Sequence, residues 1–320
     1  MNFVLSEMTF FRYFMPMILE GNRRGITSNV YVGKNQKYTN PQKYKKWLSE
    51  MSNMHHFNLY DLKDANHASK ISFLIEGVDN TSLPKDNFKV SLTYMTDYRI
   101  LYNSYVNNVD HIVFPSRSFM SFFNLKDSEK NLYLGSPKYD LKLNKKDCIE
   151  KYNLREDKRY ALIVYPRHEQ LSSFPLSDIV SSLKKLNYIP IIKSRAKHSC
   201  KDTKGCLYFE DTSWFPHTTM ELIECSDIII NSGSTLIKEC VMQKKPVINF
   251  DVKQNGVFSF LYNYGFAISN KTISVGEFES GVDQLTSVDL NSEFSRCIED
   301  HLFCGVGTSS RILDYFGDHL

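Results

Sequence analysis

The sequence has little of what marks metal-bound or disulfide-stapled proteins. Its seven cysteines are scattered and include no CxxC pair. Because zinc ligation needs closely spaced pairs of ligands, we expect no zinc site, and no other metal site is visible. Unpaired cysteines of this kind are typical of a chain that folds in a reducing cytosol.

Long apolar runs are also missing. No stretch of about 20 consecutive apolar residues occurs, so no transmembrane helix is expected. The N-terminal region lacks the unbroken apolar core of a signal peptide, because Glu7, Arg12 and Glu20 interrupt it. The sequence therefore predicts a cytoplasmic protein whose contact with a membrane is peripheral at most.

Neither sign of charge dominates. Lys and Arg together number 39, and Asp and Glu number 36, which gives a net charge of +3. Nucleic-acid-binding proteins concentrate basic residues far more strongly, so no nucleic-acid partner is expected. A mild positive balance fits an enzyme that handles anionic phosphates at one site.

The 320 residues are long for one core and suit two domains of ordinary size. A strand, a helix and a second strand follow one another over residues 2–33. Two strands joined by a helix imply a parallel sheet. Further strands of the first half are expected at residues 71–75, 89–94, 111–116 and 131–134.

The second half alternates more regularly. It predicts strands at residues 160–165, 188–193, 207–209, 228–230 and 246–250, with helices at residues 176–186, 219–225 and 235–242. This order is that of a doubly wound α/β sheet. A turn signal at residues 135–137 separates the halves. We therefore expect domains at residues 1–140 and 141–320, with the last helix free to pack back on the first domain.

Residues 34–47 are rich in Lys and Tyr and include Trp47. Such a mixture could contact anionic lipid or a lipid-linked molecule. The favoured interpretation is a solvated loop with aromatic side chains anchored in the core.

The strongest local signal for function follows the strand at residues 228–230. The residues that come after it and open a helix are Asn231, Ser232, Gly233, Ser234 and Thr235. In open parallel sheets, ligands bind beyond the carboxyl ends of the strands. Small residues let a phosphate approach the backbone, and a helix N-terminus favours an anion. The alternative is that Ser232 or Thr235 only caps the helix.

Charged residues of the same half could complete a phosphate site. Lys193 and Arg195 lie at the end of another strand and would supply positive charge to a pyrophosphate. Glu239 lies about one helical turn past Thr235 and could reach a ribose hydroxyl of the same nucleotide. Arg167 follows the first strand of this half, and it is either a further donor-binding residue or an ordinary surface residue.

Residues 222–240, followed by 245–248, resemble the donor-binding segment of GT-B-fold nucleotide-sugar enzymes. They are similar to the CDP-glycerol glycerophosphotransferases and related surface-polysaccharide glycosyltransferases, and to the non-hydrolysing UDP-N-acetylglucosamine 2-epimerases. Residues 134–140 are similar to the Gly-x-Pro-x-x-Asp turn that enters the second domain in these groups. Residues 305–312, with Arg311, are similar to their closing C-terminal helix. The resemblance covers about half of the chain.

The resemblance implies an α/β chain with two Rossmann-like, doubly wound domains that face each other across a cleft. The nucleotide would lie on the second domain and the acceptor on the first, with residues 232–235 holding the donor phosphates and Glu239 the ribose. The chain departs from both patterns. Asn231 and Ser234 replace an acid and a glycine of the epimerases, and residues 94–97 stand where the glycerophosphotransferases carry a His-Gly pair.

An inverting transfer needs a base that takes the proton of the acceptor hydroxyl. Glu7 and Asp97 follow strands of the first half and are the candidates. A buried carboxylate would suit the role if burial raised its pKa. The alternative for Glu7 is an acid that complements the dipole of the helix after it.

These observations favour a glycosyltransferase, or a polyol-phosphate transferase, that uses a nucleotide-activated donor to build a surface glycan or polysaccharide. Its partners would be the nucleotide-sugar donor and a glycan or lipid-linked acceptor, and no cofactor is expected besides the donor substrate. Two alternatives stay open: a nucleotide-sugar 2-epimerase, and a non-catalytic relative that binds a nucleotide sugar or a glycan. Fold alone does not decide among them.

Overall fold

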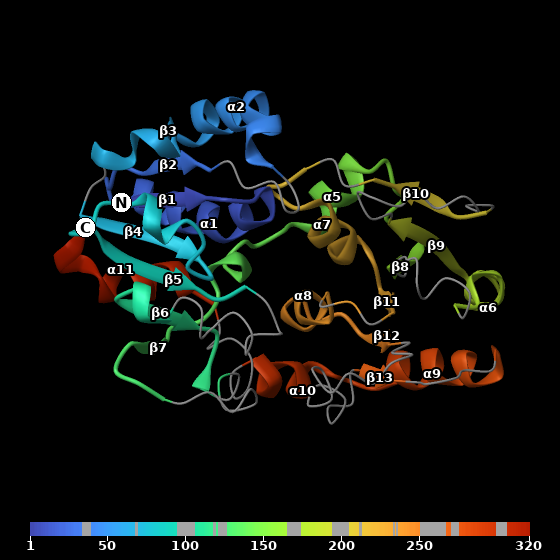
Figure 1. The fold of residues 1–320 in the computed structure, drawn as a ribbon. Helices are drawn as coiled ribbons and strands as arrows, with labels where there is room; N and C mark the ends of the chain where they lie inside the picture. Colours follow the sequence, from blue (N-terminus) through green and yellow to red (C-terminus); the bar gives the residue numbers. More distant parts are fainter. Residues whose placement is uncertain are drawn as a thin grey trace. The chain divides into compact units, whose positions relative to one another are not determined.

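The computed structural model places two parallel sheets with their helices (Figure 1). It describes residues 1–33, 40–67, 70–94, 106–117, 120, 127–164, 174–193, 205–210, 213–232, 234, 236–249, 267–269, 275–298 and 306–320. The chain divides into two compact units, Met1–Leu141 with Glu299–Leu320, and Lys142–Ile298.

Within the described residues, the first unit contains a seven-stranded sheet in the order β3-β2-β1-β4-β5-β6-β7. Its strands are β1 (Asn2–Leu5), β2 (Asn29–Val32), β3 (Asn58–Asp61), β4 (Ile71–Ile75), β5 (Phe88–Leu92), β6 (His111–Phe114) and β7 (Asn131–Tyr133). Every neighbouring pair is parallel. Strands β1 and β4 are buried along their whole length, as strands covered on both faces are.

Helices complete the first unit. The α-helices are α1 (Phe11–Arg23), α2 (Lys45–His55) and α11 (Thr308–Tyr315), and the 3-10 helices include η1 (Met8–Phe10), η2 (Pro41–Tyr44), η3 (Leu62–His67), η4 (Asn80–Ser82), η5 (Val106–Asn108), η6 (Pro137–Tyr139) and η10 (Gly317–His319). The buried face of α1 carries Phe11, Phe14, Met15 and Ile18, spaced as one face of a helix requires. The Phe14 ring lies 5.1 Å from that of Phe3 on β1. Burying such side chains contributes about 1.5–3 kcal/mol each.

The structure corrects the expectation that residues 34–47 form a solvated loop. Residues 34–39 lie outside the described residues, but residues 41–47 form η2 and the start of α2, which leads into the edge strand β3. Leu48 and Met51 are buried on the inner side of α2, and the Trp47 ring lies 5.4 Å from that of Phe11. The aromatic anchor was expected, but lysines on the outer side of a short helix concealed its apolar face.

In the second unit, the described residues form a six-stranded parallel sheet in the order β10-β9-β8-β11-β12-β13. Its strands are β8 (Arg159–Val164), β9 (Tyr188–Lys193), β10 (Leu207–Phe209), β11 (Ile228–Asn231), β12 (Val247–Asn249) and β13 (Ala267–Ser269). Its α-helices are α5 (Lys145–Lys151), α6 (Leu176–Lys185), α7 (Thr218–Cys225), α8 (Ile237–Met242), α9 (Val275–Ser287) and α10 (Asn291–Arg296). The strands expected in this half are confirmed, whereas β13, α9 and α10 were not predicted. No helix in the described part of the chain is both long and apolar enough to cross a bilayer.

The side chain of Asp140 joins the two stretches of the first unit. Its carboxylate accepts hydrogen bonds from the backbone amides of residues 307–309, at 2.8, 2.9 and 2.5 Å. A carboxylate here satisfies amides that a helix leaves unpaired and complements the helix dipole. The Nε of Arg311 donates to the carbonyl of Leu134 at 3.1 Å. The turn at residues 134–140 is therefore tied at both ends to the start of α11.

Helix α11 adds apolar side chains to the first unit. Ile312, Leu313 and Phe316 are buried, and the Phe316 ring lies 6.1 Å from that of Phe73 on β4. Helices α1 and α11 lie side by side (Figure 1), where Arg24 bonds the Asp314 carboxylate at 2.6 Å. The last helix thus completes the core of the first unit.

Replacing Asp140 with Asn should lower the free energy of unfolding of the first unit by about 2 kcal/mol, because hydrogen bonds to a charged acceptor contribute about 1.5–3 kcal/mol each and two of the three survive in weaker form. Hydrogen exchange followed by mass spectrometry should show faster exchange of the α11 amides. Asp86→Asn, at an exposed carboxylate of the same unit, is the control. Equal protection of α11 in the parent and in Asp140→Asn would show that the cap does not hold the helix.

Candidate functional site

Both sheets reverse their strand order beside their first strand. In the first sheet β1 lies between β2 and β4, and in the second sheet β8 lies between β9 and β11. Loops leaving the two sides of such a reversal turn in opposite directions and open a crevice beyond the carboxyl ends of the strands, where ligands of open α/β sheets bind. The residues at these two reversals are therefore the first candidates.

At the reversal in the second sheet, β9, β8 and β11 end level with one another. Lys193 lies opposite Val164, and the hydroxyl of Ser232 donates to the carbonyl of Val164 at 3.4 Å. Lys193 is 8% exposed and Ser232 is 1% exposed. The structure therefore brings these two residues, both singled out from the sequence, to one edge of the sheet.

Asn231 and Ser234 hold the backbone between β11 and α8. The side-chain amide of Asn231 donates to the Ser234 carbonyl at 3.0 Å. The Ser234 hydroxyl accepts from the backbone amide of Leu236 at 3.4 Å. Ser234 thus stabilises the turn before α8, which begins at Ile237 rather than at the expected position 235. The Ser232 hydroxyl contacts the neighbouring strand, and within the described residues no side-chain hydrogen bond from it caps α8.

Glu239 lies in the first turn of α8 and is 5% exposed. A carboxylate loses its hydration on burial and needs polar contacts in return. The ribose contact inferred from the sequence stays a prediction.

The other residues singled out from the sequence lie outside the described residues. They are Asp97, Arg167, Arg195, Gly233 and Thr235. Their roles stay predictions.

At the reversal in the first sheet, two buried carboxylates follow neighbouring strands. Glu7 comes two positions after β1, Glu76 comes directly after β4, and both are 7% exposed. Glu7 has an extended backbone, and its side chain makes no capping hydrogen bond to the helical turn that it precedes. The alternative in which Glu7 serves that helix therefore gains no support from hydrogen bonding.

The turn after β4 was missed by the sequence interpretation. Glu76, Gly77 and Asp79 have φ of 51, 63 and 63°, in the left-handed region that side chains disfavour. The Asp79 carboxylate accepts from the Ser6 hydroxyl at 2.6 Å, and a Cβ at Gly33 would come within 2.8 Å of it. Backbone strain of this kind gathers at functional sites. The available signal was an acid-glycine pair directly after a buried strand.

Two cations lie among aromatic rings at the same edge of the first sheet. Arg12 of α1 reaches the hydroxyl of Tyr94, two residues beyond β5, at 3.4 Å. The Lys138 ammonium lies 4.6 Å from the centre of the Tyr139 ring and is only 6% exposed. Attraction to aromatic faces stabilises cations at such positions. Single basic residues this far apart in the sequence form no pattern that would have revealed them.

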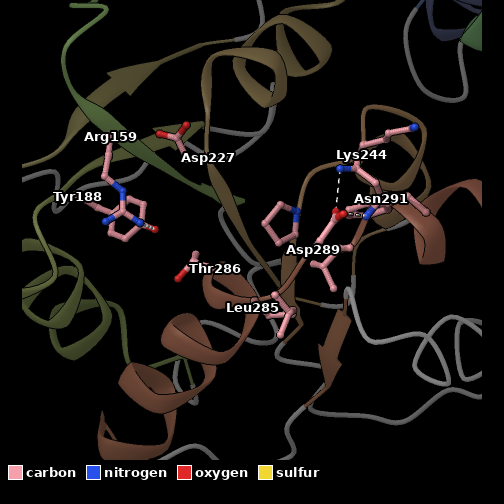
Figure 2. Close-up of a pocket in the computed structure, with 12 residues that line it drawn as sticks. Arg159, Tyr188, Asp227, Lys244, Leu285, Thr286, Asp289 and Asn291 are labelled. Carbon is pink, nitrogen blue, oxygen red and sulfur yellow. Dashed lines mark hydrogen bonds between the residues drawn. The ribbon is translucent and has the colours of Figure 1, made fainter.

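A cavity of about 280 Å³ lies at the opposite, amino edge of the second sheet (Figure 2). Arg159 and Tyr188 begin neighbouring strands, and the guanidinium lies 4.0 Å from the centre of the ring. The Asp227 carboxylate accepts from the Tyr160 amide at 2.8 Å and from Lys145 at 3.2 Å. Arg159 and Asp227, two charged residues that line the cavity, thus already contact other residues of the protein. The cavity also does not lie at the edge where open sheets bind ligands. In the described part of the chain, no group of His, Cys, Asp and Glu side chains could hold a metal ion.

The sequence matches no protein-family model and no curated protein. Solved structures resemble the fold over nearly the whole chain. A variant of the wall teichoic acid polymerase TagF is 13% identical, with a TM-score of 0.65, and the match covers 99% of this chain and 88% of that chain. A UDP-GlcNAc 2-epimerase from Neisseria meningitidis, bound to UDP-GlcNAc, is 13% identical, with a TM-score of 0.65 and coverages of 98% and 97%.

The glycotransferase of kitacinnamycin is 11% identical, with a TM-score of 0.64, and the match covers 100% of this chain and 98% of that chain. At such identities the likeness shows the fold alone. It confirms the fold class and the resemblance that the sequence suggested, namely two Rossmann-like domains of the GT-B type.

Replacing Lys193 with Met should weaken the binding of pyrophosphate roughly tenfold, because a charge-assisted hydrogen bond contributes about 1.5 kcal/mol or more. Isothermal titration calorimetry measures the affinity. Lys158→Met, directly before β8 at the amino edge of the same sheet, should bind like the parent. If Lys193→Met keeps both the parental melting temperature and the parental affinity, Lys193 does not contact the anion.

Proposed function

We propose that the chain is a glycosyltransferase, or a polyol-phosphate transferase. It would move a sugar or polyol phosphate from a nucleotide-activated donor to a glycan or lipid-linked acceptor, in the cytoplasm, during synthesis of a surface polysaccharide. The observation that carries the proposal is the strand reversal of the second sheet, where Lys193 and Ser232 lie at one edge. The similar structures support it, since one is a wall teichoic acid polymerase and another holds UDP-GlcNAc.

The donor diphosphate occupies the edge of the second sheet in this proposal. Negative charge grows on the leaving diphosphate as its bond to the transferred group breaks, and fixed positive charge stabilises it. Lys193 supplies that charge, with Arg167 and Arg195 as further candidates. Backbone amides of residues 233–235 approach the phosphates, and Glu239 accepts from a ribose hydroxyl.

The acceptor is activated at the first sheet. Its hydroxyl oxygen attacks the donor, and the hydroxyl proton passes to a carboxylate within hydrogen-bond reach. Glu7 is buried at the strand reversal of this sheet and is our choice of base. Asp97 is the alternative.

A nucleotide-sugar 2-epimerase is the second candidate, and one observation favours it. Glu7 and Glu76 are two buried carboxylates that follow neighbouring strands, and an epimerase needs more than one acid-base group around the sugar. The two reactions differ in what they consume. An epimerase converts the nucleotide sugar without an acceptor, whereas a transferase releases its nucleotide only when an acceptor is present.

The first test is a thermal-shift screen with UDP, CDP, GDP, ADP and CMP and their common conjugates. A ligand that binds only the native state raises the melting temperature. A shift with one nucleotide, absent in Lys193→Met, supports the donor site, and product analysis with and without acceptor then separates the two reactions. If no nucleotide shifts the melting temperature at millimolar concentration, that result would count against both the transferase and the epimerase. Binding without turnover, even with acceptors supplied, would indicate a non-catalytic binding relative.

Replacing Glu7 with Gln should lower kcat by about 10²–10⁴-fold, because a general base contributes a factor of that size. The affinity for the donor nucleotide should stay unchanged, since the donor site belongs to the other sheet. Steady-state kinetics and calorimetry measure the two effects. Glu50→Gln, at an exposed carboxylate of α2, is the matched control. Parental kcat in Glu7→Gln would exclude Glu7 as the base.

A further inference from the structure

Two cysteines far apart in the sequence meet between α5 and α7 of the second unit. Cys148 is 4% exposed and Cys225 is 0% exposed, and they share one small buried cluster with Ile149. The two helices pack directly on each other. Leu143 and Leu154 close the cluster from the ends of α5. The cluster around the two cysteines is thus largely apolar, although Tyr152 also packs against it.

The two thiols shift each other's pKa in opposite directions. A side-chain hydrogen bond with Cys225 lowers the pKa of Cys148. Lys151, one helical turn further along α5, also lowers that pKa, while burial and the charges of Glu221 and Glu224 oppose the change. The same hydrogen bond, together with burial, raises the pKa of Cys225. Cys148 is therefore the more acidic member of the pair, and a thiolate is the reactive form of cysteine.

We propose that Cys148 and Cys225 form a reversible disulfide that links α5 to α7, with hydrogen peroxide as the oxidant. The Cys148 thiolate attacks one peroxide oxygen, the O–O bond breaks, and the departing hydroxide takes up a proton as water. The resulting sulfenic acid is then attacked at its sulfur by Cys225, and a second water leaves with the Cys225 proton. In total, the two thiols lose two electrons and two protons, and one peroxide becomes two waters.

Access to the buried pair comes through α5. This helix has only 7 residues, and helices this short depend on their packing to stay formed. The Lys151 side chain on the same helix is 47% exposed, although its ammonium bonds both oxygens of Glu221 at 2.7 Å. Local opening of α5, without unfolding of the sheet, exposes Cys148 to a small oxidant.

The disulfide site is separate from the proposed donor site. Cys225 ends α7 directly before the amino end of β11, whereas Ser232 follows the carboxyl end of that strand. A strand of 4 residues keeps the two positions apart by about 13 Å, at a rise of about 3.3 Å per residue. Formation of the disulfide therefore does not depend on whether the donor site binds a nucleotide.

The experiment treats the purified full-length protein with hydrogen peroxide and maps its peptides without reduction. The expected product is one cross-linked peptide pair containing Cys148 and Cys225, which separates again on reduction with dithiothreitol. The cross-link closes a long loop and should raise the melting temperature by roughly 5–10 °C. Cys148→Ser and Cys225→Ser should lose both the cross-link and the shift, and Cys206→Ser, at a partly exposed cysteine, should keep both.

Oxidation of other cysteines with this pair still as free thiols would overturn the proposal. So would a cross-link that pairs Cys148 or Cys225 with a different cysteine. Should either serine variant fail to fold, the peptide map of the parent protein alone still decides between these outcomes.

Discussion

The carboxylate of Asp140 joins parts of the first unit that lie far apart in the sequence. It accepts from three successive amides at the start of α11, and Arg311 returns a bond to the carbonyl of Leu134. Without these bonds the amides at the start of α11 would lose their charged partner, at the point where the helix enters the fold. Helix α11 in turn brings Phe316 against the ring of Phe73 on β4. The bonds of Asp140 thus help to hold Phe316 against the first sheet.

The two sheets have the same arrangement of strands around their first strand. Each starts with a central strand that is buried apart from the exposed Arg159 at the start of β8, adds strands on one side, and then returns to the other side of that strand. Because the strands are parallel, their carboxyl ends lie at one edge, and polar residues that follow them are gathered there. Ser232 beside Val164 and Glu76 beside the end of β1 are products of this arrangement. The strands supply the rigid frame, and the chemistry lies in the first residues beyond them.

The buried strands and the residues that follow them could be predicted from the sequence. Strands covered on both faces are continuous apolar runs, such as residues 228–230, and their ends are marked by small or polar residues. The edge strand β3 has exposed and half-buried side chains in alternation, so it left no such run. Helix α2 hid its buried Leu48 among lysines.

The parts of the sites that escaped prediction depend on contacts between distant positions. The turn at Asp79 is held by Ser6 of a different strand end, and Lys138 lies against an aromatic ring of α1. Cys148 and Cys225 meet only because α5 packs on α7. No local pattern of residue types encodes such pairs. The positions that follow single strands could therefore be named in advance, whereas the partners that surround them could not.

The division of the first unit into two stretches has a consequence for biosynthesis. Residues 299–320 belong to that unit but are translated after the whole second unit. Until they emerge from the ribosome, the side chains that pack on Ile312, Leu313 and Phe316 have nothing to cover them. At about 5–20 residues per second, that interval is on the order of 10 s or more. The nascent first unit must stay incomplete and partly apolar while the second unit is being translated, which makes it a client for chaperones during that time.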